Sequence, residues 1–520
     1  MADPRTSFSR YLTEKNESEL HVLLKQGVFK PLFLYHVVSF NFLPWVALLI
    51  PKRQGGQYFR RLVLALNLAY GIEALRTNRA LLGGNGYMIG MLVAWWLIWS
   101  ATLFVFSDVE RDFQRIERTT TDIDGPGLKP GREISSRANT MHSDVDNHAQ
   151  FYWQAYPSKF THRIEWCAGL LFNLRGPEWN WRAPRLGPIP KTVNEQLKSG
   201  FLSKHHRIEN DASCLTAKVR LRRAFRTCLT SYLILDALKV IMMRDPYFRG
   251  TVEVDVVPPL PFSFLASIPL GVRFYHCFFS CMGVYIALNF VTSFNPICFL
   301  GLSLAFPNAS RKLTGAPLDS AWLYADSFGP FFSPTLDHGL AGAWGQWWHQ
   351  LFRYGFTATA RWVLSLLPTS WGTKSDVKRV TYIVIGFALS GFVHACGSYT
   401  QFKGTRPLTG PFSFFFLQSL AIIVEYTFKA VIVPKTPMSS TPRWLRRTTN
   451  ATIVFFWLLL SGGLIADDFA RGGLWLMEPV PFSPLRGFGL ANGQGWWCWQ
   501  GTWFAYWSDG TYWGSGVRVI

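Results

Sequence analysis

The sequence predicts an all-α, polytopic integral membrane protein with about nine transmembrane helices. The chain has 520 residues, of which 49% are hydrophobic and 16% are aromatic. Only 16% are charged, whereas a soluble chain normally has about a quarter charged residues. The apolar residues also gather in runs of about 17–25 residues, the length that crosses a bilayer. Composition and run length together exclude an ordinary soluble domain.

Nine apolar runs are the candidates for these helices. In chain order they occupy residues 29–50, 62–78, 86–107, 227–243, 270–292, 351–367, 380–400, 412–434 and 451–467. Membrane helices vary in tilt and length, so the expected number is approximate. A further apolar run at 296–306 is too short to cross. We expect it to be either re-entrant or the end of a bent span.

The runs divide the chain into three regions. Residues 1–28 form a polar N-terminal tail, 29–467 the membrane domain and 468–520 an aromatic C-terminal tail. A long loop at 108–226 is rich in basic residues, which favour the cytosolic side of a membrane. We therefore expect this loop in the cytosol and the N-terminus in the lumen. In that topology Asn16, which lies in an Asn-x-Ser sequon, is a candidate for glycosylation.

The formal net charge of +20 raises the question of a nucleic-acid partner. The basic residues are spread over the loops between apolar runs, as expected from membrane topology, so no nucleic-acid partner is predicted. The same positive face would attract an anionic cytosolic substrate such as a coenzyme A thioester. The eight cysteines include no CxxC and no Cys/His set with zinc spacing. We therefore expect neither a disulfide scaffold nor a metal site.

Two histidines carry the functional prediction. His394 ends the apolar run 383–394, and an ionisable side chain at membrane depth persists mainly where it does chemistry or lines a polar path. Neutral imidazole accepts a proton, which suits general-base activation of a hydroxyl, and Ser390 lies one helical turn away. The alternative is a core histidine bonded to a backbone carbonyl. His349 ends the tryptophan-rich segment 343–349, and it is the expected second member that orients the acyl group or stabilises developing negative charge.

Two charged pairs also lie within apolar runs. Asp236 precedes Lys239 by three residues, and Glu425 precedes Lys429 by four. Residues at these spacings share one face of a helix. We expect both pairs to be structural ion pairs rather than catalysts.

Four motifs in order resemble the wax-synthase-like branch of the membrane-bound O-acyltransferase (MBOAT) family. They are Arg-Gly-Pro-Glu-Trp-Asn-Trp at 175–181, Tyr-Leu-Ile-Leu-Asp at 232–236 with Asp-Pro at 245–246, Trp-Gly-Gln-Trp-Trp-His-Gln at 344–350, and Ser-Gly-Phe-Val-His at 390–394. The first of these looks like a segment of the fungal members. Together the motifs cover roughly residues 170–430.

The resemblance implies an MBOAT-like fold and acyl transfer from coenzyme A to an alcohol in the endoplasmic reticulum membrane. His394 matches the family's invariant intramembrane histidine, and His349 matches the preceding Asn-or-His position. Many fungal members acetylate terpenoid or meroterpenoid secondary metabolites. The expected partners are therefore acetyl-CoA as co-substrate, a lipophilic alcohol and the bilayer, without a bound cofactor. Two alternatives remain: a long-chain acyl-CoA wax-ester or sterol acyltransferase, and a transporter that uses His394 in a proton path.

The motifs also supply candidate substrate contacts. These are Trp344, Trp348, Ser390, Arg353, Arg175, Trp179, Asn180 and Trp181. The chain departs from the family's usual Phe-Trp-Gly-Arg-Arg-Trp-His, with Ala343 at the Phe and Gln346-Trp347 at the Arg-Arg pair. Donor binding is therefore expected from Arg353 or from the basic residues of 175–191. Lipid headgroup contacts are the alternative role for these residues.

Overall fold

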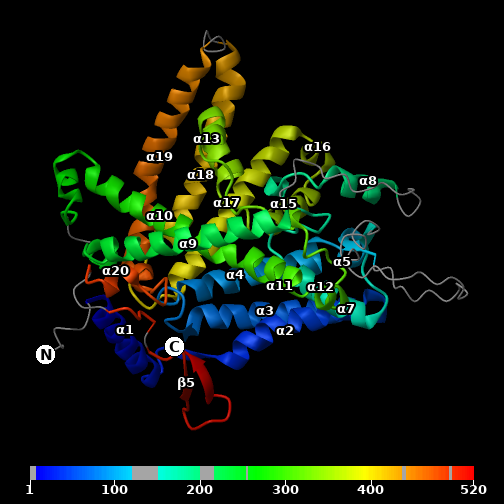
Figure 1. The fold of residues 1–520 in the computed structure, drawn as a ribbon, viewed down its shortest axis with the longest axis horizontal. Helices are drawn as coiled ribbons and strands as arrows, with labels where there is room; N and C mark the ends of the chain where they lie inside the picture. The colour runs from blue at the N-terminus through cyan, green and yellow to red at the C-terminus, as the bar shows by residue number, and fades with distance from the viewer. Residues whose placement is uncertain are drawn as a thin grey trace, which may run out of the picture. The chain divides into compact units, whose positions relative to one another are not determined.

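The computed structural model describes residues 8–119, 150–199, 216–252, 256–435, 441–490, 495–499 and 501–520, which are mostly helical (Figure 1). The chain divides into two compact units. The larger unit comprises Met1–Ser107, Leu229–Phe290 and Phe328–Ile520, and the smaller unit comprises Asp108–Cys228 and Val291–Ser327. The loop predicted at 108–226 thus corresponds to the first segment of a folded unit.

Each of the nine predicted apolar runs overlaps an α-helix. These helices are α2 (Leu34–Leu49), α3 (Gly56–Thr77), α4 (Tyr87–Ala101), α9 (Ala217–Met242), α10 (Gly271–Asn295), α15 (Arg353–Ser365), α17 (Ser375–Thr400), α18 (Ser413–Thr427) and α19 (Arg443–Arg471). Within the described residues, five helices are long and apolar enough to cross a membrane. They are Tyr87–Phe106, Gly271–Ala305, Ser375–Thr400, Leu408–Ile432 and Arg443–Arg471. A multi-pass helical membrane protein is therefore confirmed.

The other four helices fall short of this standard for physical reasons. The apolar helix α2 has 16 residues and α15 has 13, so they extend about 24 and 20 Å. The hydrocarbon core of a bilayer is about 30 Å thick. In α3 and α9 the apolar residues are interrupted by charged ones, beginning with Arg60 in α3 and Lys218 in α9. The number of about nine spans stays a prediction.

The short apolar run at 296–306 continues α10. A π-helical turn (Pro296–Leu300) and α11 (Gly301–Ala305) follow directly on the last residue of α10. Together they form one candidate span of 35 residues. Of the two possibilities for this run, the structure supports the end of a span interrupted at a proline.

Shorter helices connect and flank the long ones. In the larger unit they are α1 (Phe8–Lys25), α13 (Phe332–His338), α14 (Leu340–Gly342), α16 (Thr369–Gly372) and α20 (Pro484–Gly487). In the smaller unit they are α5 (Val109–Asp112), α7 (Phe160–Leu171), α8 (Lys191–Ser199) and α12 (Pro307–Leu313). The larger unit also has π-helical turns, among them η10 (Ala343–Trp347) and η11 (Leu408–Phe412).

The expectation of an all-α fold is met only in part, because each unit of this mostly helical chain also contains a small sheet. The sheet of the larger unit has four strands. Its strand order is β2 (Asn78–Arg79), β1 (Lys30–Phe33), β6 (Gly516–Val519), β5 (Phe504–Trp507). Strands β5 and β6 form an antiparallel hairpin, and β6 pairs with β1. Part of the aromatic C-terminal tail is therefore a hairpin that pairs with the N-terminal region.

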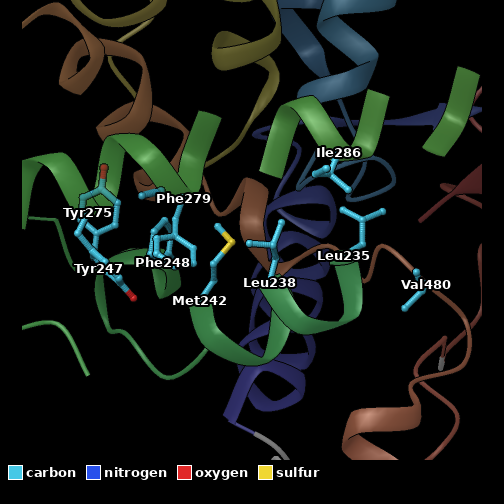
Figure 2. Packing of buried hydrophobic residues seen from close by; sticks show 10 residues of the cluster. Leu235, Leu238, Met242, Tyr247, Phe248, Tyr275, Phe279, Ile286 and Val480 are labelled. Carbon is cyan, nitrogen blue, oxygen red and sulfur yellow. The ribbon is translucent and has the colours of Figure 1, made fainter. Parts of the chain in front are cut away.

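One hydrophobic cluster of the larger unit joins α9 to α10 (Figure 2). Leu235, Leu238 and Met242 come from α9, and Tyr275 and Phe279 come from α10. Tyr247 and Phe248, from the segment between the two helices, belong to the same cluster. The contacts fix the position of α10, which continues into a candidate span. Such packing matters because helices in a bilayer associate mainly by close van der Waals contact.

The two predicted ion pairs have different outcomes. The Glu425–Lys429 pair is confirmed at 2.7 Å. The Asp236–Lys239 pair is wrong as predicted, because each residue is bonded to the segment 475–486 instead. Lys239 donates to the carbonyl oxygens of Trp475 and Leu476 at 2.7 and 3.0 Å. Asp236 accepts hydrogen bonds from the Ser483 hydroxyl and, at 3.1 Å, from the Leu485 amide. Both residues thus bond to a segment that is distant in the sequence, and not to each other.

The smaller unit has its own core around a two-stranded antiparallel sheet. Strand β3 (Arg115–Arg118) pairs with β4 (Phe151–Gln154). The buried Arg115 guanidinium lies 2.6 Å from Glu165 and 2.5 Å from Glu117. Arg115 also lies over the indole ring of Trp179, 5.9 Å from its centroid. A buried cation with two carboxylates is compensated, and the arrangement holds α7 against the sheet.

Candidate active site

His394 lies on α17 between two glycines that allow close packing. A Cβ at Gly397 would lie 2.9 Å from the backbone oxygen of Tyr87, and one at Gly391 would lie 3.0 Å from the backbone oxygen of Phe412. Small residues of this kind let the backbones of neighbouring helices approach. Residues of α4 and η11 therefore pack directly against the segment of α17 that carries His394.

The imidazole of His394 is held by two aromatic neighbours. The Tyr87 hydroxyl lies 2.6 Å from Nδ1 of His394, and Phe415 stacks on the ring with centroids 4.6 Å apart. Tyr87 itself is 3% exposed. Among the described residues, no hydrogen-bond partner is present for Nε2 of His394. This nitrogen is not fully enclosed by protein atoms. One ring nitrogen is therefore held by Tyr87, and the other makes no hydrogen bond to the described residues.

His349 lies just after the π-helical turn η10, in a cluster of aromatic rings. Its ring contacts Phe328 edge-on at 5.9 Å and Trp348 at 5.4 Å. Trp348 contacts Trp344, and Trp344 contacts Phe415, the ring stacked on His394. The structure thus connects the two predicted catalytic histidines through a continuous series of aromatic contacts within the larger unit.

A buried glutamine fixes the tryptophan-rich segment. Gln418 of α18 is 0% exposed, and its Oε1 accepts hydrogen bonds from the indole nitrogens of Trp344 and Trp457 at 3.3 and 2.9 Å. Its Nε2 donates to Ser461 at 3.2 Å. Because the Trp344 nitrogen is used in this way, the ring can offer a substrate only its apolar faces. Trp348 lies in the same aromatic cluster.

Arg353 and Ser390 were also predicted to contact a substrate. Arg353 begins α15, and its Nη1 lies 3.5 Å from the carbonyl oxygen of Gly345. It therefore braces the tryptophan-rich segment. Ser390 is half-buried on α17, one turn before His394. Their predicted contacts with a substrate stay predictions.

The four remaining candidates lie in the smaller unit and have structural partners there. Arg175 donates to the carbonyl oxygens of Ala325 and Asp326, both at 2.9 Å. Burial, followed by the nearby Arg220, lowers the pKa of Arg175 to about 10. Trp179 is 0% exposed, so in this conformation it cannot touch a ligand. Asn180 hydrogen-bonds to the backbone of Asp112 and Gln114, and Trp181 packs edge-on against Phe113.

The glycosylation candidate Asn16 lies in the middle of α1 and is 6% exposed. A glycan needs an accessible side chain, so transfer to Asn16 would require that α1 is not yet packed. Glycosylation of Asn16 stays a prediction.

Sequence reasoning missed three residues of this site: Tyr87, Phe415 and Gln418. Tyr87 begins an apolar run and is 307 residues from His394. Phe415 is one of many phenylalanines in the chain. Gln418 had a detectable signal, because an uncharged polar side chain inside an apolar run needs hydrogen-bond partners.

The fold and the site together define a multi-pass membrane protein with a histidine on a membrane-length helix. Residues 324–417, which include His349 and His394, match the family model described as "Membrane bound O-acyl transferase family". This part of the chain is therefore similar to membrane-bound O-acyltransferases, enzymes that transfer an acyl group to a hydroxyl oxygen. The resemblance predicted from the four motifs is confirmed.

Curated relatives from fungi are more specific but distant. "O-Mevalon transferase macI" of Penicillium terrestre is 23% identical over 431 residues, 80% of this chain and 81% of that protein. "O-Mevalon transferase yanI" of Aspergillus niger is 26% identical over 276 residues, 51% and 53% of the two chains. "Acetyltransferase eriL" of Hericium erinaceus is 30% identical over 157 residues, 29% and 37%. No solved structure matches the chain.

Proposed function

We propose that this protein transfers an acetyl group from acetyl-CoA to a hydroxyl of a lipophilic terpenoid or meroterpenoid in fungal secondary metabolism. The observation that carries the proposal is His394, held on a membrane-length helix by Nδ1 with Nε2 unbonded among the described residues. The relative named as an acetyltransferase supports the acetyl donor. We further propose that the reaction takes place in the endoplasmic reticulum membrane.

In the proposed mechanism His394 acts as a general base. Its Nε2 takes the proton of the acceptor hydroxyl while the oxygen attacks the thioester carbonyl carbon. The C–S bond then breaks, and the proton passes to the sulfur of coenzyme A. His349 orients the carbonyl or stabilises the oxyanion. Transfer is direct, so an acyl adduct on the enzyme after incubation with labelled donor alone would contradict this step.

A second candidate differs in the acyl group. Two relatives, one of which matches over most of both chains, are named as O-mevalon transferases. Transfer of a mevalonyl group would use the same two histidines, since the chemistry at the carbonyl is identical. The difference lies in the space that the longer, hydroxylated chain needs.

The test uses microsomes with the wild type or His394→Ala, labelled acetyl-, mevalonyl- or palmitoyl-CoA, and a panel of terpenoids, sterols and fatty alcohols. Acetyl ester formation on a terpenoid should fall by roughly 10²–10⁴-fold in His394→Ala, the usual effect of losing a general base. The control is His338→Ala, because His338 is an exposed histidine of α13 in the same unit. It should keep wild-type turnover.

Each other outcome reassigns the function. Ester formed only from mevalonyl-CoA would establish the second candidate, and ester only from palmitoyl-CoA would indicate lipid esterification. Undiminished ester formation in His394→Ala would remove the proposed mechanism. A flux of solute across vesicles that depends on His394, without any ester, would instead support a transporter.

A further inference from the structure

We propose that Tyr87 is a positioning residue that sets the tautomer and the ring orientation of His394. This inference rests on the proposed function, because it concerns how His394 becomes a base. The underlying observation is the 2.6 Å separation between the Tyr87 hydroxyl and Nδ1 of His394. Tyr87 is placed for this role by its environment, since its ring also packs edge-on against Phe469 at 5.2 Å.

The hydrogen bond can have either polarity, and only one polarity permits catalysis. If the phenol donates to Nδ1, the neutral imidazole carries its proton on Nε2 and cannot accept another there. If Nδ1–H donates to the phenol oxygen, Nε2 is unprotonated and can take the acceptor's proton. The second arrangement requires a separate acceptor for the phenol's own hydrogen.

Asp468 of α19 supplies a suitable acceptor. It precedes Phe469, which contacts Tyr87, and its carboxylate interacts electrostatically with the Tyr87 phenol. Its Oδ1 accepts a hydrogen bond from the Arg406 amide at 2.6 Å, whereas its enclosed Oδ2 accepts no hydrogen bond of good geometry from the described residues. The hydroxyl of Ser398 lies close to the same carboxylate and is an alternative donor to it.

An enclosed carboxylate oxygen without a partner is costly, so a donor is expected there. A phenol directed toward Asp468 would leave its own oxygen to accept Nδ1–H from His394. The series Asp468, Tyr87, His394 then works as an orienting chain: the carboxylate fixes the phenol, and the phenol fixes the imidazole. Only His394 touches the reacting atoms.

The decisive variant is Tyr87→Phe, which keeps the ring packing and removes the hydroxyl. We expect kcat to fall on the order of 10- to 100-fold, as when other partners that orient a histidine are removed. The KM values for donor and acceptor should stay within about twofold, because the buried Tyr87, 3% exposed, offers no surface for a substrate contact. The control is Tyr275→Phe, since the enclosed Tyr275 hydroxyl has no hydrogen-bond partner among the described residues. Its loss should leave kcat unchanged.

A double variant tests whether Tyr87 acts through His394. In Tyr87→Phe/His394→Ala the residual rate should equal that of His394→Ala alone, because a positioning residue has nothing left to position. Wild-type kcat in Tyr87→Phe, with His394→Ala inactive, would overturn this inference and leave the proposed function intact. Full activity of His394→Ala would instead overturn the proposed function.

A chemical probe gives a readout that needs no substrate. Diethyl pyrocarbonate modifies an imidazole nitrogen that carries no proton, and mass spectrometry measures the modification at His394. With Nδ1–H no longer held by the phenol, the proton is free to occupy Nε2, so the rate at His394 should fall by about threefold or more in Tyr87→Phe. It should not change in Tyr275→Phe. Equal rates in the wild type and Tyr87→Phe would overturn the inference.

Discussion

At the scale of single residues, the structure shows how a few polar side chains are held within an apolar protein. Several of these side chains are bonded to residues that are far away in the sequence. Asp337 of α13 is a clear case, because Arg447 of α19 donates to both of its carboxylate oxygens at 2.8 and 3.1 Å. Arg443 donates to the same carboxylate.

These hydrogen bonds make a prediction about pH. The bonds from Arg443 and Arg447 lower the pKa of Asp337 to about 2. An aspartate in an unfolded chain has a pKa of about 3.9. The stabilisation is therefore fully present above about pH 4 and is lost as the pH falls toward 2. Thermal unfolding of the wild type and Asp337→Asn in detergent should differ at pH 6 and converge below pH 4. A difference that grows on acidification would contradict this assignment.

The same scale shows why sequence reasoning recovered only part of the site. An imidazole inside an apolar run is conspicuous, so His394 could be predicted. Tyr87 could not, because a tyrosine at the start of an apolar run has many ordinary roles and its partner is 307 residues away. The Asp236–Lys239 pair failed for the same reason, since the true partners lie near residue 480.

At the scale of elements, the central feature is the close approach of α4 to α17. The approach depends on Gly397, where a Cβ would lie 2.9 Å from the Tyr87 backbone oxygen and 3.0 Å from its ring. Gly386 lies on the same helix, but a Cβ there would meet nothing within 4 Å. The two glycines therefore offer a matched comparison.

Gly397→Ala should separate α4 from α17 and destabilise the protein by about 1–3 kcal/mol, the usual cost of overpacking. Because the shift moves Tyr87 relative to His394, kcat should fall as well. Gly386→Ala should be neutral or stabilise the helix by about 0.5–1 kcal/mol. Thermal unfolding and turnover measured on both variants check the prediction. Equal behaviour of the two would show that helix contact at Gly397 is unimportant.

Apolar runs long enough to fold as helices could be predicted as elements. The short ones were less certain, because a helix of 16 residues such as α2 has the composition of a span without its length. The hairpin of β5 and β6 was missed because alternating aromatic residues also describe an interfacial belt. A strand pairing with β1, nearly 500 residues earlier, has no local signal.

At the scale of the whole molecule, the larger unit is assembled from distant parts of the chain. Strand β1 lies between β2 and β6, and the Ile520 carbonyl accepts a hydrogen bond from the Leu82 amide at 2.8 Å. The Tyr35 hydroxyl donates to the carbonyl of Trp513 at 2.8 Å. Main-chain pairing thus ties the C-terminal hairpin to the first hundred residues.

Deletion of residues 504–520 should therefore lower the thermal unfolding temperature, because β1 loses the partner strand that satisfies its backbone groups. The matched control replaces only the exposed Tyr506 and Tyr512 by serine, which keeps the strand pairing. If the deletion and the control unfold alike, the strand pairing does not contribute to stability.

The hydrogen bond between Tyr87 and His394 also has a consequence for biosynthesis. Tyr87 is made early in translation, whereas His394 and the ring stacked on it are made more than three hundred residues later. A nascent chain that has inserted only its first helices contains Tyr87 but does not yet contain His394. Premature termination between α4 and α17 yields a product that has Tyr87 but lacks His394, the proposed proton acceptor. Two fragments divided between α4 and α17 and expressed together contain both halves, so activity would report whether they reunite within the bilayer.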